Sequence, residues 1–346
     1  MHNKRQQLNK RIRVPSNAEE PPHNRFQPEA DGGRYKVHNV RMLVNKTTVT
    51  YFIIKGISDD PKLQFPIFLL VLLTYLITLS GNLTILIACR HPVLHTPMYF
   101  FLGNLSVLDI SCSTIVLHRI LLNFISGDKT VQFSQCMIQM YLFGSLGITE
   151  LLILSSMSYD RYVAICKPLH YHRIMNSRIC TLLASLSWML GFFQILPPFC
   201  IVFSYTCYSS NEVNHFFCDL VPLMKISCND TTVLELLFLI EGLLPMIFMP
   251  FVLTFTPYIF IINAILKIST STGRRKAFYT CSSHLIVVIL LYTTVASQYL
   301  TPNLSSTLES KKLLSLFNTA AIPMLNPFIY SLKNKDVKRA LKKSSS

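Results

Sequence analysis

The chain has 346 residues, of which 51% are hydrophobic and only 14% are charged. Soluble domains carry about 25% charged residues, so this composition argues against an ordinary soluble domain and favours a membrane protein. The formal net charge of +15 is compatible with nucleic-acid binding. The basic residues are grouped by loop, however, as in a membrane protein that is oriented by its charges, and we expect no nucleic-acid partner.

Residues 1–41 are polar, basic and rich in proline, and they contain no apolar segment. They therefore resemble neither a signal peptide nor a packed domain. We expect a disordered extension that the mature protein need not contain, because Met42 is a plausible alternative start. Residues 42–64 are then an extracellular leader.

Seven apolar stretches follow, each long enough for the helix of about 20 residues that crosses about 30 Å of hydrocarbon. Their approximate ranges are 65–89, 98–124, 134–159, 181–203, 236–262, 278–301 and 313–332. Three of them contain an acid in the apolar core, namely Asp109, Glu150 or Glu241. The pattern predicts an all-α membrane protein in which residues 65–332 form a bundle of seven transmembrane helices.

The loops between these stretches alternate in charge. Loops on one side carry the basic residues Arg90, Arg161, Lys167, Arg173, Arg178, Lys267, Arg274, Arg275 and Lys276, whereas those on the other side carry Asp128, Glu212, Asp219, Asp230, Glu235 and Glu309. The positive-inside rule therefore predicts an extracellular N-terminus and a cytoplasmic C-terminus, although nine Lys and Arg residues within 1–41 oppose this orientation. In the cytoplasmic tail, 333–346, "KNKDVKRALKK" predicts a short amphipathic eighth helix on the inner leaflet.

Four of the ten cysteines, Cys136, Cys207, Cys218 and Cys228, lie on the outer side. Four thiols in an oxidising compartment allow three pairings, and the spacing alone does not choose between them. The outer segments also contain sequons for N-glycosylation at Asn45, Asn229 and Asn303. We favour Asn45 because it lies in the leader.

Five motifs identify a family. They are "GNL" at 81–83, "LHTPMYFFLGNLSVLDI" at 94–110, "MSYDRYVAICKPLHY" at 157–171, "KAFYTCSSHL" at 276–285 and "PMLNPFIYSLKNKDVK" at 323–338. In this order they resemble the olfactory receptors, rhodopsin-like G-protein-coupled receptors, and in particular the terrestrial-type class. The resemblance covers residues 42 to about 343. It implies the disulfides Cys136–Cys218 and Cys207–Cys228.

Asp109 and Glu150 are carboxylates within apolar spans, and a buried charge without a partner is costly, so a functional role is expected. The resemblance implies that they approach each other, in a polar network with Asn82, and hold a sodium ion or share a proton. Catalysis is the alternative for two acids. No nucleophile, metal-ligand cluster or phosphate-binding loop accompanies them, so we expect no enzyme and no other cofactor.

The resemblance places an odorant pocket in the outer half of the bundle, among spans three, five, six and seven. The positions implied to line it are Phe143, Gly144, Gly147, Ile148, Gly242, Met246, Tyr292, Val295, Ala296, Tyr299 and Thr319. Most are apolar or small, which suits a volatile, mostly hydrophobic molecule with one or two polar atoms. Helix packing is the alternative role for each of them.

The resemblance also implies a switch that meets the G protein. Its residues are Asp160, Arg161, Tyr162, Tyr258, His284, Asn326, Pro327 and Tyr330. Asp160 is expected to restrain Arg161 in the inactive state, with anchoring at the membrane surface as the alternative role of Arg161. Pro250 and Pro327 match hinge positions, whereas Pro245 and Pro257 are additional prolines.

We therefore expect an odorant receptor in the plasma membrane that activates a heterotrimeric G protein of the stimulatory olfactory type and raises cyclic AMP. A similar receptor for a non-odorant metabolite is the alternative within this class. A transporter or channel would require internal repeats and a polar path through several helices, and neither is evident.

Overall fold

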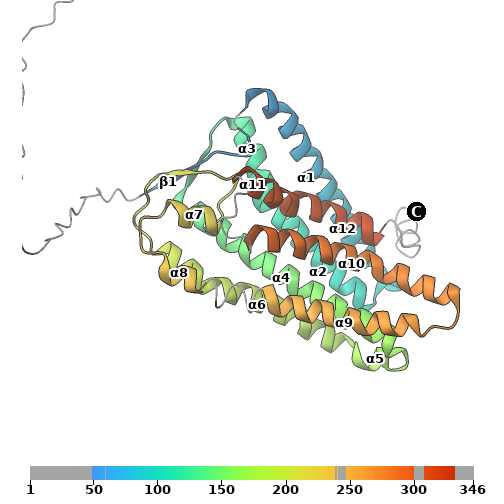
Figure 1. Cartoon of the computed structure of the whole chain (residues 1–346). Coiled ribbons are helices and arrows are strands. Elements are labelled where there is room, and N and C mark those ends of the chain that lie inside the picture. Colours follow the sequence, from blue (N-terminus) through green and yellow to red (C-terminus); the bar gives the residue numbers. More distant parts are fainter. Residues whose placement is uncertain (1–48, 59, 238–239, 241–246, 300–307, 332–346) are drawn as a thin grey trace, which may run out of the picture. The chain divides into compact units, whose positions relative to one another are not determined.

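A computed structural model of the chain describes residues 49–58, 60–237, 240, 247–299 and 308–331 (Figure 1). The predicted extension 1–41, Met42, Asn45, Glu241, Gly242, Pro245, Met246, Asn303 and the tail 333–346 lie outside the described residues. Helices dominate the described part, and the bundle runs from Pro61 to Ser331.

The first half of the bundle contains three long helices or helical runs. They are α1 (Pro61–Cys89), the run formed by α2 (Pro97–Ser113), the π-helical turn η2 (Thr114–His118) and α3 (Arg119–Ser126), and α4 (Phe133–Cys166). Helix α1 begins where the Asp60 carboxylate accepts a hydrogen bond from the Lys62 N–H and Pro61 occupies the first turn. The short helices η1 (Pro92–Leu94), η3 (Pro168–His170) and α5 (Tyr171–Ile174) lie in the inner loops.

The second half begins with α6 (Ser177–Phe203), which the Asn176 side chain caps. The remaining helices are α7 (Leu220–Ile226), α8 (Thr232–Leu237), α9 (Met249–Leu266), α10 (Ser271–Tyr299), α11 (Leu308–Leu316), the π-helical turn η5 (Phe317–Ala321) and α12 (Ile322–Ser331). Helix α9 continues through Pro257 as one element.

Membrane-length helices account for most of the predicted spans. Among the described residues, 5 helices are long and apolar enough to cross a bilayer, and His284–Gln298 is a further, shorter apolar stretch within α10. The seventh span consists of α11, η5 and α12. The predicted seven-helix membrane bundle is confirmed.

Two helices extend well beyond the apolar stretches that predicted them. Helix α4 continues from the predicted end at 159 to Cys166, and α10 begins at Ser271 instead of 278. Hydropathy marks only the part of a helix that lies in hydrocarbon, while the backbone hydrogen bonds continue into the aqueous phase. Asp160, Arg161, Arg274 and Arg275 are therefore helical residues.

A small sheet at the outer end was not predicted. Strand β1 (Tyr51–Ile54) pairs antiparallel with β2 (Thr130–Gln132) and parallel with β3 (Glu212–Val213), in the order β2-β1-β3. The aromatic and β-branched sequence of β1 favours a strand. Part of the predicted leader 42–64 is therefore the central strand of this sheet, and its last residues belong to α1.

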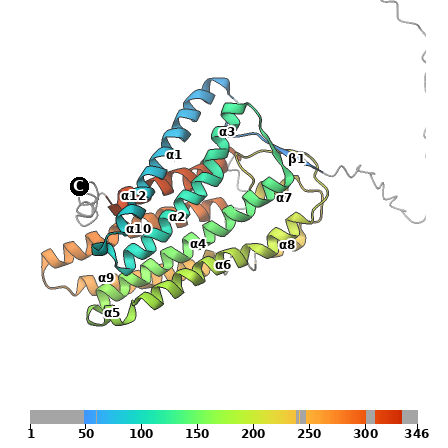
Figure 2. The same ribbon diagram turned by 180° about the vertical axis from the view of Figure 1, so that it is seen from behind.

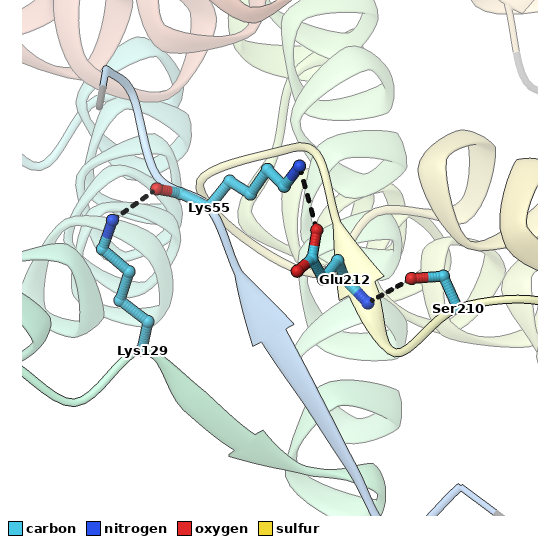
Figure 3. A network of polar contacts seen from close by, with 4 residues as sticks. All are labelled: Lys55, Lys129, Ser210 and Glu212. Carbon is cyan, nitrogen blue, oxygen red and sulfur yellow. Dashed lines mark hydrogen bonds and ion pairs between the residues drawn. The ribbon is translucent and has the colours of Figure 1, made fainter. Parts of the chain in front are cut away.

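Polar contacts join this sheet to the loops around it (Figure 3). The Lys55 ammonium lies 3.0 Å from the Glu212 carboxylate, and Lys129 Nζ donates to the Lys55 carbonyl at 3.1 Å. The Glu212 N–H donates to Ser210 Oγ at 3.0 Å. Because Lys55 and Glu212 are half exposed, this ion pair contributes little to stability, and the backbone pairing and buried Phe52 hold the strand.

Helix α4 runs through the bundle with α2 on one side and α6 on the other (Figures 1 and 2). The packing with α6 is close at Gly191, where an added Cβ would clash with Thr149 Oγ1. Helices α1 and α12 also approach closely, since a Cβ at Gly81 would lie 2.9 Å from Pro327 Cβ. Small residues thus allow the close helix contacts that membrane bundles require.

Two disulfides order the second outer loop. Cys136–Cys218 joins the first turn of α4 to this loop, and Cys207–Cys228 closes a segment within it. The pairing is the one that the family resemblance implies. The loop is thereby held over the outer end of α4.

Candidate functional site

An internal cavity of about 170 Å³ lies between α4, α6, α10 and η5. Of the predicted pocket residues, those in its wall are Phe143, Gly144, Gly147, Ile148, Val295 and Thr319. Gly147 is the most open position, because an added Cβ would have no neighbouring atom within 4 Å. A Cβ at Gly144 would lie 3.1 Å from Ile195 Cδ1. A larger side chain at position 147 would therefore extend into open space, whereas one at position 144 would press against Ile195.

The other predicted pocket residues do not line this cavity in the described part of the chain. Tyr292 is buried against Phe251 and Phe255, and its hydroxyl lies 3.3 Å from Thr254 Oγ1. Ala296 lies on α10 outside the cavity wall. Gly242 and Met246 lie outside the described residues, and so does the side chain of Tyr299.

Helix α6 contributes a wall that the sequence did not predict, through Ile195, Pro198 and Phe199. An apolar span shows that a helix is in the membrane, but it does not show which face meets lipid and which meets a cavity. The two residues that follow Cys218, Asp219 and Leu220, also line the cavity. Their closeness to a disulfide that anchors the loop on α4 was the available signal.

Asp219 is a nearly buried carboxylate in the cavity wall. Its side chain is 8% exposed, and Oδ1 accepts a hydrogen bond from the Leu220 N–H at 2.8 Å. Removal from water raises the pKa of Asp219 to about 6, and the Leu220 hydrogen bond opposes this effect in part. The loop thus presents a hydrogen-bond acceptor to an otherwise mostly apolar space.

A chain of polar side chains forms the side of the cavity between α10 and the seventh span. Thr294 donates to Asn318, whose Nδ2 donates to Gln298 Oε1 at 3.1 Å. Gln298 Nε2 lies 3.4 Å from Ser315 Oγ. Gln298 and Asn318 line the cavity, and Asn318 lies in the π-helical turn η5. Such turns frequently occur at functional sites, because they reorient side chains that a regular helix would place elsewhere.

Glu150, a residue of the predicted ion network, lines the cavity, and its buried Oε1 has no hydrogen-bond partner among the described residues. The Asn326 amide donates to both oxygens of Asp109, at 3.1 and 3.0 Å. Asn82 bonds instead to the carbonyls of Thr78 and Pro323. Carboxylate oxygens are the type of ligand that a small hard cation prefers.

The inner end of α4 carries the Asp160–Arg161 pair. Arg161 Nη2 lies 3.8 Å from Asp160 Oδ2, and the Tyr171 hydroxyl donates to Asp160 Oδ1 at 2.7 Å. Burial, followed by the Asp160 charge, raises the pKa of Tyr171, so this hydroxyl remains a donor. Tyr171 was part of a quoted motif but received no predicted role. The structure places it as a second partner of Asp160.

The remaining switch residues form separate contacts. Tyr258 and His284 hydrogen-bond and stack, which connects α9 to α10, with ring centroids 6.0 Å apart. Tyr162 packs against Phe260 on α9. Pro327 lies against Gly81, and the side chain of Tyr330 is outside the described residues. The residues of the predicted switch are therefore distributed over α4, the α9–α10 pair and α12.

The family profile described as "Olfactory receptor" matches residues 71–346. Human olfactory receptor 6C1 is 44% identical over 86% of this chain and 95% of its own length. The chain belongs to the olfactory receptor family. Human olfactory receptor 6C3 is 44% identical, and mouse olfactory receptor 8U3 is 43% identical, over 86% and 87% of this chain and 96% and 94% of their lengths, respectively.

Membership of the olfactory receptor family defines the general role of this protein. Olfactory receptors are multi-pass proteins of the plasma membrane that respond to odorants, couple to G proteins and are not enzymes. The cavity and the Asp160–Arg161 contact lie at opposite ends of α4. One helix thus connects the candidate ligand site to the cytoplasmic face.

Proposed function

We propose that this receptor binds a small, mostly hydrophobic volatile molecule in the cavity and activates a heterotrimeric G protein of the stimulatory olfactory type, which raises cyclic AMP. The cavity between α4, α6, α10 and η5 supports this proposal, because it is mostly apolar and has a few polar groups in its wall. Apolar burial supplies affinity, and Asp219, Gln298, Asn318 and Thr319 offer hydrogen bonds that orient a ligand.

The coupling step is a population shift. A ligand that contacts α4 and α10 better in the active bundle favours that state, and the Asp160–Arg161 contact opens at the inner end. The exposed Arg274 and Arg275, in the first turns of α10, then face the G protein. Charge reversal of Arg275 that leaves both surface expression and signalling unchanged would remove it from this role.

A reporter screen tests the proposal. Cells expressing the chain from Met1 or from Met42 are exposed to a panel of volatiles, and cyclic AMP is measured. We expect at least one agonist. With Gly147→Leu, the added side chain fills open space, so larger agonists should lose potency more than smaller ones. A panel that is inactive in cells with verified surface receptor, or an agonist series that Gly147→Leu leaves unchanged, would contradict it.

We further propose that Asp109 and Glu150 hold a sodium ion or share a proton. The unpaired Glu150 oxygen and the Asp109–Asn326 hydrogen bonds support this role. If sodium binds, replacing it by choline should change agonist potency in the parent receptor but not in Glu150→Gln. Equal sensitivity of the two proteins would argue against the ion.

A further inference from the structure

A second hollow lies on the outside of the bundle, between α1, α2 and α6. This groove encloses about 760 Å³ and shares no lining residue with the ligand cavity. Leu86, Gly103 and Val107 lie along it, and His95 and Asn176 lie in the loops at its cytoplasmic end. The groove is therefore apolar along the helices and polar at its mouth.

The groove opens to lipid and extends over one leaflet. The apolar side chains that flank it are exposed, with Ile87 at 50%, Phe100 at 41% and Leu182 at 52%. From Pro97, where α2 begins, to Val107 the helix rises about 15 Å. This is about half of the 30 Å hydrocarbon core. A groove of this depth at the inner helix ends matches the acyl layer of the cytoplasmic leaflet.

The mouth of the groove is basic. Arg90, Arg173 and Arg178 each follow directly after a lining residue, and all three are exposed. The stretches that line the groove, 86–107 and 172–181, contain no Asp or Glu. In the part of the chain that the structure describes, no ion pair joins these arginines to an acidic side chain. The surface therefore complements an anion held at the inner membrane surface.

We propose that this groove binds an anionic phospholipid of the inner leaflet. Its acyl chain lies against Leu86, Gly103 and Val107, and its head group lies at the basic mouth. At the deep end, the amide of Asn104 donates to the Phe100 carbonyl, and its Oδ1 accepts from Trp188 Nε1 at 3.0 Å. Both polar ends of Asn104 are occupied, so this end of the groove suits hydrocarbon.

The chain contains a natural probe for this site. Trp188 is its single tryptophan, is half-buried, and bonds to a residue of the groove wall. The full chain would be placed in phosphatidylcholine vesicles containing a minor fraction of brominated phosphatidylserine or brominated phosphatidylcholine, and Trp188 fluorescence would be measured. We expect stronger quenching by the anionic lipid at the same mole fraction.

Charge variants separate the groove from general membrane attraction. One basic residue near an anionic surface corresponds to about a fivefold change in lipid binding. Arg90→Gln and Arg173→Gln should each reduce the preference for phosphatidylserine by about this factor. Arg274→Gln, a matched loss of charge on α10 away from the groove, should leave the preference unchanged.

A filling variant tests the acyl site. A Cβ at Gly103 would approach only Leu86 Cδ2, at 4.0 Å, so Gly103→Leu fills the groove without a backbone clash. It should reduce quenching by brominated phosphatidylserine while the melting temperature and helical content are maintained. The comparison of head groups in the parent protein needs no variant.

Equal quenching by the two phospholipids in the parent protein would overturn the proposal. Stronger quenching by a brominated sterol than by phosphatidylserine would also overturn it and assign the groove to a sterol. A preference for phosphatidylserine that survives both Arg90→Gln and Arg173→Gln would place the anionic lipid elsewhere.

Discussion

At the scale of single residues, Asp219 gives the receptor a measurable pH dependence. Its pKa in the folded protein is about 6, above the ordinary 3.8, because burial disfavours the charged form. The folded state therefore keeps a proton that the unfolded state releases between about pH 4 and pH 6. The free energy of unfolding falls as the pH rises through this window.

Asp219→Asn removes the free-energy cost of burying the charged carboxylate and retains an acceptor for the Leu220 N–H. We expect the variant to be more stable than the parent by about 1–3 kcal/mol at pH 7, with the difference shrinking toward pH 4. Thermal unfolding in detergent measures it. Burial and the nearby Lys312 lower the pKa of His215 to about 4, which gives the opposite slope in both proteins and cancels in the comparison. A constant difference across this pH range would contradict the assignment.

Tyr171 is a second residue whose effect a single substitution can measure. Its hydroxyl donates to Asp160, and a hydrogen bond to a charged group contributes about 1.5–3 kcal/mol. Tyr171→Phe should loosen the restraint on Arg161 and raise ligand-independent cyclic AMP by up to about tenfold. Tyr159→Phe is the control, because Tyr159 is 40% exposed and its hydroxyl has no partner among the described residues. Equal basal signalling in the two variants would exclude the role of Tyr171.

At the scale of secondary-structure elements, β1 makes the leader part of the fold. Phe52 is fully buried and Tyr51, its neighbour, is 46% exposed. Phe52→Ala should cost about 3–5 kcal/mol, whereas Tyr51→Ala should cost no more than about 0.5 kcal/mol. Melting temperature and surface expression measure both. If the two variants are equally stable, the strand does not contribute to the outer end of the bundle.

The same elements show which features could be predicted from sequence. The apolar spans were predictable because hydrocarbon imposes a length requirement that each segment meets alone. Strand β1 depends instead on pairing with β2 and β3, which lie far along the chain. The four residues of β1 do not indicate which strands they pair with. Likewise, Ile195 and Phe199 could not be assigned to a cavity wall, because lipid and cavity select the same apolar side chains.

At the scale of the whole molecule, α4 connects an outer cavity to the proposed inner switch. Helix α4 carries Gly147 in the cavity wall and Arg161 at the cytoplasmic end. Ser155 on α4 contacts Thr254 on α9 at 2.7 Å and donates to the Pro250 carbonyl, so the fifth span is coupled to α4 between these two sites. A ligand-dependent shift of α4 against α9 and α10 would therefore reach the inner face.

The agonist-dependent cyclic AMP response of Arg161→Ala, compared with the parent receptor at matched surface expression, tests this connection most directly. The cavity is distant from Arg161 along α4, so ligand binding should persist while signalling is lost. We predict a flat response of the variant to volatiles that activate the parent. A response of Arg161→Ala with the parent's amplitude and potency, in a receptor verified at the surface, would contradict the account.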